Sequence, residues 1–166
     1  LSALLKVGLR VKHRPVDRQT FLALDRATIE NLGLFPRETR PMKGHSLFEV
    51  INRTKTTMGN RLLAKWLKEP LMDMAAINAR LDAVTLFMKA PALIPQLQHL
   101  LKQVRDIERI VSRLTCGISN PRDLVSLKES LAQIPHLKTT LASERLNDLA
   151  GNLLPFATLV DLLERA

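Results

Sequence analysis

The sequence predicts an all-α protein of long packed helices, with at most one short N-terminal strand. Hydrophobic residues make up 46% of the 166 positions, so the chain can bury a core. Aromatic residues make up only 4% and Tyr is absent, whereas strands are enriched in aromatic and β-branched residues. Apolar residues also recur at alternating spacings of three and four through much of the chain. That spacing is typical of helices that pack side by side.

The first 20 residues differ from the remainder. A short apolar segment is followed by the basic, proline-containing stretch "RVKHRPVDR", which is typical of a linker. We therefore expect residues 1–20 to be a linker or the tail of a preceding domain, and residues 21–166 to form one helical domain. The chain begins with Leu1 rather than Met and shows no signal-peptide pattern. We expect it to be a piece of a longer protein.

Two short helices are expected near the start of the helical domain. Residues 20–24, "TFLAL", are short and apolar and form the candidate strand. Asp25 comes next, at the position of a helix N-cap, ahead of "RATIENL". Ser46 and Glu49 match the capping-box spacing, which predicts a second short helix ending near Asn52.

The helical signal strengthens after this point. Either Thr56 or Thr57 can cap a helix over residues 58–68, and Pro70 stops it. Asp73 can cap the next helix. The apolar positions of that helix fall on one face at spacings of four, three and four: Ile77, Leu81, Val84 and Met88.

The second half of the chain predicts further helices. One is expected to carry a continuous 3-4-3-4-3 seam and to end at Gly117. The residues of that seam are Leu97, Leu100, Val104, Ile107, Val111 and Leu114. Asn120, with proline after it and Asp123 three positions on, predicts the start of the next helix. Pro135 and Pro155 are expected to interrupt or kink the remaining helical segments, and either could allow bending.

The positive charge is unevenly distributed. Residues 1–68 contain 14 basic and 5 acidic residues, whereas residues 69–166 are neutral overall, so the net charge of +9 lies in the first part. On the helix over residues 58–68, the basic side chains cluster within about 60° of arc, opposite an apolar side that includes Trp66 and Gly59. We expect that apolar side to be buried, with Gly59 allowing a neighbouring helix to approach. The basic face comprises Lys55, Arg61, Lys65 and Lys68.

Three roles remain open for this basic face. It could be solvated or contact acidic groups of a neighbouring domain, or it could bind the phosphates of a nucleic acid. A stacking platform for single strands is excluded, because Trp66 stands alone on the apolar side. We favour an interdomain contact over direct reading of DNA.

The sequence contains no pattern typical of an active site. None of its six glycines belongs to a phosphate-binding motif. The four histidines are scattered without metal-ligand spacing, and Cys116 is a lone cysteine, which favours a reducing, intracellular setting. Asp106 and Glu108 are expected to pair with Arg109 and Arg105, respectively, rather than to act in acid–base catalysis. No catalytic, cofactor-binding or metal-binding residue is assigned.

Several stretches resemble the core, or lever, domain of the MutS family of DNA mismatch-repair proteins. "LDRATIENL" is similar to an element near the start of that domain. "SLFEVINRTKTTMGNRLLAKWLKEPLMDMAAINARLDAV" resembles the segment that opens it. "VRDIERIVSRL", "NPRDLVSLKESLAQIPHL" and "LVDLLERA" are similar to its later elements, in the same order. The resemblance covers roughly residues 21–166 and would place residues 1–20 at the end of the family's connector domain.

The resemblance implies a structural role for this chain within a larger enzyme. The parent would bind mismatched double-stranded DNA and hydrolyse ATP with Mg²⁺, while neither the phosphate loop nor the mismatch-reading motif lies in this stretch. The implied partners are a second MutS-type subunit and a MutL-type protein. No association with a membrane is implied. The implied location is the bacterial cytoplasm, associated with the nucleoid, or the nucleus or an organelle in a eukaryote. Two alternatives are a stand-alone helical nucleic-acid-binding module and a protein–protein adaptor bundle.

Overall fold

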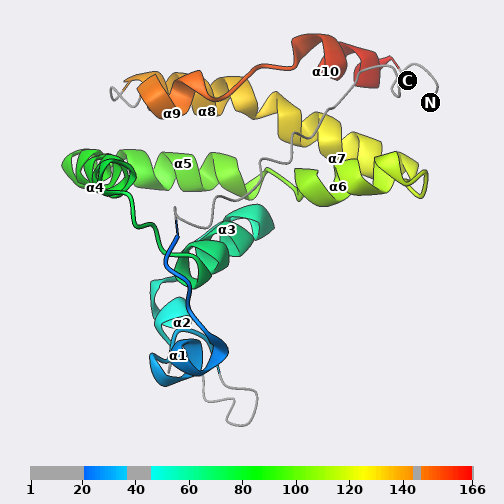
Figure 1. Ribbon diagram of the computed structural model, residues 1–166. Helices are drawn as coiled ribbons and strands as arrows, with labels where there is room; N and C mark the ends of the chain where they lie inside the picture. The colour runs from blue at the N-terminus through cyan, green and yellow to red at the C-terminus, as the bar shows by residue number, and fades with distance from the viewer. Residues whose placement is uncertain (1–20, 37–45, 144–146, 166) are drawn as a thin grey trace.

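The computed structural model describes residues 21–36, 46–143 and 147–165, which form helices joined by short connections (Figure 1). The predicted all-α class is confirmed. In the described ranges the helices are α1 (Arg26–Asn31), α2 (Leu47–Ile51), α3 (Thr57–Lys68), α4 (Met74–Lys89), α5 (Leu93–Lys102), α6 (Ile107–Thr115), α7 (Pro121–Ala132), α8 (Ile134–Ser143), α9 (Asn147–Gly151) and α10 (Ala157–Glu164). The predicted linker, residues 1–20, lies outside the described residues.

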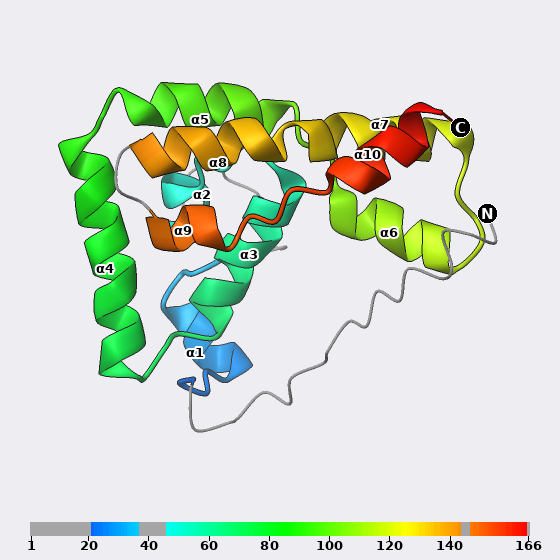
Figure 2. The same ribbon diagram turned by 90° about the horizontal axis from the view of Figure 1, so that it is seen from above.

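Helices α5 to α10 form a layered body, which we call the helical layer. Seen from above, α5 runs beside α8, and α10 lies beside α7 (Figure 2). Helices α7 and α8 follow each other end to end along the same line (Figure 2). The amide of Leu137 donates to the carbonyl of Gln133 at 3.0 Å, so hydrogen bonding continues across their junction. This pair therefore forms a spine that runs through the layer.

Two buried apolar clusters stabilise the helical layer. The first contains Leu93, Leu97, Leu137, Leu141 and Ala150 and joins α5, α8 and α9. The second contains Ile110, Leu127 and Leu131, with partly buried residues of α10 packed against it. Burial of such side chains is the main favourable term in folding. Because α8 contributes to the first cluster and α7 to the second, the two halves of the layer are joined through a continuous pair of helices.

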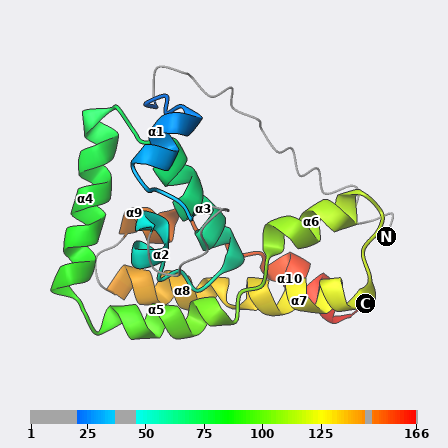
Figure 3. The same cartoon turned by 90° about the horizontal axis from the view of Figure 1, so that it is seen from below.

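Helices α1, α2 and α3 project away from this layer, and we call them the arm. Figure 1 shows the arm below the layer, and Figure 3 shows the same helices from below. The amides of Leu47 and Phe48 donate to the carbonyls of Gly33 and Leu34, which ties α2 to the end of α1. Neither buried cluster of the described residues contains a residue of the arm. The arm is therefore not packed into the core of the layer.

Helix α4 connects the arm to the layer and lies crosswise to α5 (Figure 2). Its C-terminal end reaches the first cluster through Phe87 and Ala90, which are partly buried there. The predicted apolar face is mostly solvent-exposed: Leu81 is 58% exposed and Val84 and Met88 are exposed as well, while Ile77 is partly buried. The spacing therefore identified an apolar stripe correctly, but not whether anything in the described chain covers it.

The helix starts predicted from capping residues are confirmed. Asp25, Ser46, Asp73 and Asn120 each accept a hydrogen bond from a backbone N–H in the first turn of the helix they precede. Of the two threonines considered for α3, it is Thr56 that caps the helix. These side chains satisfy amides that have no partner within a helix.

Two predictions about element boundaries were wrong. The candidate strand is reduced to an isolated antiparallel bridge between Phe21 and Leu71, while position 20 lies outside the described residues. The 3-4-3-4-3 seam does not form one helix, because the chain leaves helical geometry between Lys102 and Ile107. We call residues 103–106 the elbow.

Among the described helices, none is long and apolar enough to cross a bilayer.

The positions of two prolines explain the later breaks. Pro135 occupies the second position of α8, where its missing N–H costs no intrahelical bond. Pro155 lies in the non-helical stretch between α9 and α10, so this region is split as predicted. Gly117 follows α6 with a φ of 71°, a left-handed conformation that glycine adopts at little cost.

Candidate functional site

The candidate site is the basic face of α3 and the loop before it. Lys55, Arg61, Lys65 and Lys68 are all exposed at the surface of the described structure. They do not act as one group, because three of them have different partners. The geometry therefore divides the predicted face into one side chain that holds the fold together and three that lie along the surface.

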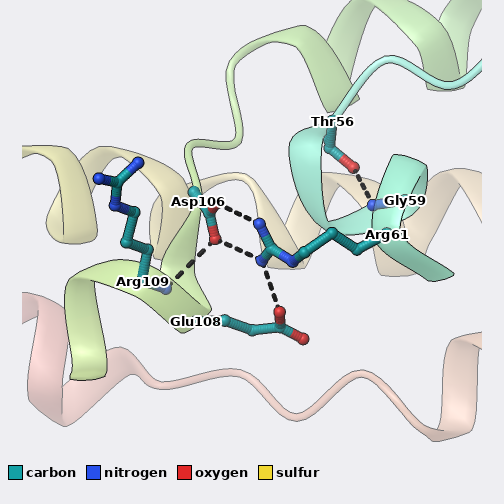
Figure 4. A network of polar contacts seen from close by, with 6 residues as sticks. All are labelled: Thr56, Gly59, Arg61, Asp106, Glu108 and Arg109. Atoms are coloured by element: carbon teal, nitrogen blue, oxygen red, sulfur yellow. Dashed lines mark hydrogen bonds and ion pairs between the residues drawn. The ribbon is translucent and has the colours of Figure 1, made fainter. Parts of the chain in front are cut away.

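Arg61 joins the arm to the elbow (Figure 4). Its Nη1 donates to Oδ2 of Asp106 at 2.6 Å, and its Nη2 donates to Oδ1 of Asp106 at 2.8 Å. Nη2 also donates to Oε2 of Glu108 at 2.6 Å. A two-pronged guanidinium–carboxylate pair is both stronger and more directional than a single contact. One arginine of α3 thus binds two carboxylates that lie 45 and 47 positions further along the chain.

This contact corrects the predicted pairing of the two acids. Asp106 and Glu108 were expected to bind the side chains of Arg109 and Arg105, but both bind Arg61. Asp106 is the N-cap of α6 rather than a residue inside a helix, so its side chain is free to converge with that of Glu108. The partner that Arg109 provides is its backbone N–H, which donates to Asp106 Oδ1 at 3.2 Å (Figure 4).

The ion pair changes the acidity of its members. Hydrogen bonds from Arg61 lower the pKa of Asp106 from 3.8 to about 2, against an opposing effect of desolvation. The same two carboxylates raise the pKa of Arg61 above its ordinary value. The side chain of Asp106 is 17% exposed and that of Arg61 is 49% exposed. Solvent and salt therefore reach the pair, and both partners stay charged at neutral pH.

A second contact fixes the other side of the elbow. The amide of Arg105 donates to Oγ of Ser130 at 2.9 Å, and Ser130 Oγ donates to the carbonyl of Ser126 at 2.7 Å. Ser130 is fully buried, so its hydroxyl would carry a desolvation cost without these partners. The elbow is therefore held by α7 on one side and by α3 on the other.

Within the described part of the chain, the remaining cations of the basic face have weaker partners or none. Lys65 lies 3.8 Å from Glu69 one turn later on the same helix. Lys68 lies over the ring of Phe35 at 5.1 Å from its centroid. Lys55 is exposed in the loop before α3. Exposed pairs of this kind contribute little to stability, so these three lysines are available for another surface.

The apolar side of α3 was expected to be buried, and this is wrong for the described structure. No residue of α3 is buried, and Trp66 is 41% exposed. The guanidinium of Arg80 stacks over Trp66 at 3.8 Å from the ring centroid, which links α3 to α4 by a cation–π contact. Gly59 does not admit a neighbouring helix either: a Cβ there would lie 3.0 Å from Oγ1 of Thr56, the cap of its own helix.

Metal-ligating side chains do not gather in the described part of the chain. No group of three or more such side chains occurs among the described residues. Cys116 is an exposed free thiol. Two of the four histidines, His13 and His45, lie outside the described residues. What the structure brings together is a set of positioning contacts around the elbow.

Comparison with known proteins identifies the family. The model of MutS domain III matches residues 27–166. The chain belongs to the MutS domain III family. The DNA mismatch repair protein MutS of Thermotoga neapolitana is 42% identical over 160 residues, which cover 89% of this chain and 20% of that protein. That of Methanosarcina barkeri is 41% identical over 155 residues, covering 91% of this chain and 17% of that protein.

The predicted family resemblance is thus confirmed, and the chain spans about a fifth of the length of these MutS relatives. Within this domain III chain, the sequence predicted Arg61 as part of a basic face but not its partners. Ser130 was not singled out at all, because a serine inside a helix carries no local signal of a contact 25 positions away.

Proposed function

We propose that this chain is the lever part of a DNA mismatch-repair protein, coupling the nucleotide state of an ATPase domain to DNA clamping and mismatch recognition. The observation that carries the proposal is the match to MutS domain III over residues 27–166. Coupling between distant sites needs rigid elements that both sites can bias. The α7–α8 spine, with one buried cluster packed on each of its two helices, supports this proposal as such an element.

The parent's chemistry belongs to the same proposal. The whole protein would bind mismatched double-stranded DNA, hydrolyse ATP with Mg²⁺, dimerise with a second MutS-type subunit and engage a MutL-type partner. It would act in the bacterial cytoplasm at the nucleoid, or in the nucleus or an organelle of a eukaryote. The sequence contains neither of the phosphate-binding glycine motifs considered for an ATP site. The chain is therefore proposed to be a structural domain rather than an enzyme in itself.

The basic face takes an interdomain role in this proposal. Arg61 contacts the chain's own elbow, whereas Lys55, Lys65 and Lys68 remain exposed for an acidic surface of another domain. Residues 1–20 would be the end of the connector domain. Neither assignment requires the face to read DNA bases, a task that needs side chains directed into a groove.

A flexible insertion into the spine tests the lever. Four residues of glycine and serine placed after Gln133 would separate α7 from α8 in the full-length protein. We expect ATP hydrolysis and DNA binding to persist, while the dependence of DNA release on ATP is lost. The same insertion after Ile118, in the connection between α6 and α7, is the matched control. Unchanged coupling with the insertion at Gln133 would argue against the lever.

The stand-alone nucleic-acid-binding module makes a different prediction. A lever should bind duplex DNA weakly and without preference for a mismatch. A binding module should keep submicromolar affinity at physiological salt, with a salt dependence that falls when Arg61, Lys65 and Lys68 are replaced by Ala. Duplex binding by the chain across a salt series separates the two.

The adaptor bundle draws support from the exposed apolar stripe on α4, which includes Met74, Leu81, Val84 and Met88. A lever also exposes such a stripe wherever other parts of its parent pack. An adaptor would bind its partner through this stripe in the full-length protein, and Leu81→Asp would abolish that binding. In a lever, the same substitution would instead change the contacts between domains.

A further inference from the structure

The elbow is the place where arm and layer meet through polar contacts. In the described residues, both buried apolar clusters lie outside the arm. The arm reaches the layer covalently through α4 and non-covalently through Arg61. Without a shared core, the direction of α3 relative to the layer depends on these connections. A short, two-pronged ion pair restricts that direction more than a single flexible contact does.

Asp106 connects this restriction to α6. Its two carboxylate oxygens accept from Arg61, and one of them also accepts from the amide of Arg109 in the first turn of α6 (Figure 4). Any movement of α3 that keeps the ion pair must therefore carry the N-terminus of α6 with it. Arg105, the preceding residue, is fixed to Ser130 of α7. The contacts thus run from α3 through two adjacent elbow residues into both α6 and α7.

We infer that Arg61 is a positioning residue that fixes the direction of α3 relative to the α6–α7 pair, through Asp106 and the elbow. Salt or a competing charged surface can break the ion pair, because the side chains of Arg61 and Glu108 are 49% and 69% exposed. The direction of α3 relative to α6 and α7 is a property of this chain alone, whereas its consequence for coupling rests on the proposed function.

Distances between spin labels test the inference directly. In the full-length protein, with Cys116 and the other accessible cysteines replaced, labels at Ala27 on α1 and Glu129 on α7 report the position of the arm. Labels at Gln96 and Glu129 report the layer alone. All three sites are exposed in the described structure. The measurement needs neither DNA nor ATP, so it can succeed or fail independently of the proposed lever.

Arg61→Ala should broaden the distribution of distances from Ala27 to Glu129 and leave that from Gln96 to Glu129 unchanged. We expect the population with a displaced arm to grow about fivefold, as suits a partly exposed charged contact. Lys89→Ala, which removes an exposed cation of α4 outside the basic face, is the matched control and should change neither distribution. The arm distribution of Arg61→Lys should be intermediate between those of the native protein and Arg61→Ala, since lysine keeps the charge but loses the two-pronged geometry.

Salt provides a second test that does not depend on how the variants fold. Raising the ionic strength to about 1 M, where the screening length falls to about 3 Å, should broaden the arm distribution of the native protein toward that of Arg61→Ala. The variant itself should respond little. If the arm distribution were the same for the native protein and Arg61→Ala at low salt, with both folded, the positioning role would be wrong.

Discussion

The helical layer on one side, and the arm with helix α4 on the other, have similar apolar patterns but are stabilised in different ways. In the layer, Leu93, Leu97 and Leu131 are buried and form two clusters around α7 and α8. On α3 and α4, Leu62, Trp66, Leu81 and Val84 are exposed in the described structure. The arm is positioned instead by polar and cation–π contacts of Arg61 and Arg80. Helical spacing thus establishes which side of a helix is apolar, and tertiary contacts alone determine whether that side is buried.

The largest expected difference concerns matched leucines. Leu93→Ala empties part of the first cluster and should lower the free energy of unfolding by about 2–5 kcal/mol. Leu81→Ala removes the same atoms from the exposed face of α4 and should change it by at most about 0.5 kcal/mol. Urea denaturation of the two variants measures both. Similar losses would mean that the face of α4 is as important for folding as the core.

A second comparison concerns two serines near the elbow. Ser130→Ala should cost about 1–3 kcal/mol, because it removes the acceptor of a partly buried hydrogen bond from the amide of Arg105. Ser112→Ala, on the exposed side of α6, should have an effect within about 0.5 kcal/mol. Thermal unfolding of each variant provides the measurement. An equal response would show that the elbow does not depend on Ser130.

The ion pair should also have a signature in the dependence of stability on pH. Binding to Arg61 lowers the pKa of Asp106 to about 2 in the folded state, below its ordinary 3.8. Its contribution is therefore fully present above about pH 5 and is lost as the pH falls from about 4 to 2. Asp106→Asn keeps a capping side chain but removes the charge. The variant should be less stable than the native protein near neutral pH, and the gap should close toward about pH 2.

Denaturation at a series of pH values measures that gap. Glu108→Gln is a useful second variant, because it removes the more exposed carboxylate, which makes one hydrogen bond to Arg61 rather than two. It should give the smaller loss near neutral pH. A gap for Asp106→Asn that stays constant across the acidic range would contradict the assigned ion pair.

The smallest expected effect comes from replacing one glycine of the arm and one glycine of the helical layer. Gly33 follows α1 with a φ of 62°, and Gly117 follows α6 with a φ of 71°. A Cβ added at either position would meet nothing within 4 Å, so only the backbone conformation opposes a side chain there. Alanine at either site should cost about 1 kcal/mol in backbone strain. Gly117→Ala should lower the protection of the slowest amides of α7 against hydrogen exchange. Gly33→Ala should affect only α1 and α2, because local opening there does not unfold the layer.

Local sequence signals predicted the fold well. Asp25, Ser46, Asp73 and Asn120 marked helix starts correctly, because a cap depends on residues only two or three positions apart. The elbow was missed because the apolar spacing passes through it without a break. Val104, within the elbow, still packs against the first cluster, although the backbone there is not helical.

The candidate site was less predictable, for a physical reason. Arg61 and Asp106 were both singled out, but their pairing depends on how α3 is directed at the elbow. Neighbours on one helix supplied plausible partners for Asp106 and Glu108, and the folded geometry chose a more distant one. The family resemblance, by contrast, rested on several long motifs in a fixed order, and the match over residues 27–166 confirms it.

We propose that rigid contacts within this chain, in the α7–α8 spine and at the elbow, couple the nucleotide state of the full-length protein to DNA binding. The measurement that tests this proposal most directly is ATP-dependent release of a mismatched duplex by the full-length protein carrying Arg61→Ala. Lys89→Ala is the control, because it removes an exposed cation of α4 that lies outside the basic face. We expect ATP hydrolysis and DNA binding to persist in Arg61→Ala, while the acceleration of release by ATP falls; Lys89→Ala should behave like the native protein. Full acceleration in Arg61→Ala, in a protein whose arm is shown to be displaced, would contradict it.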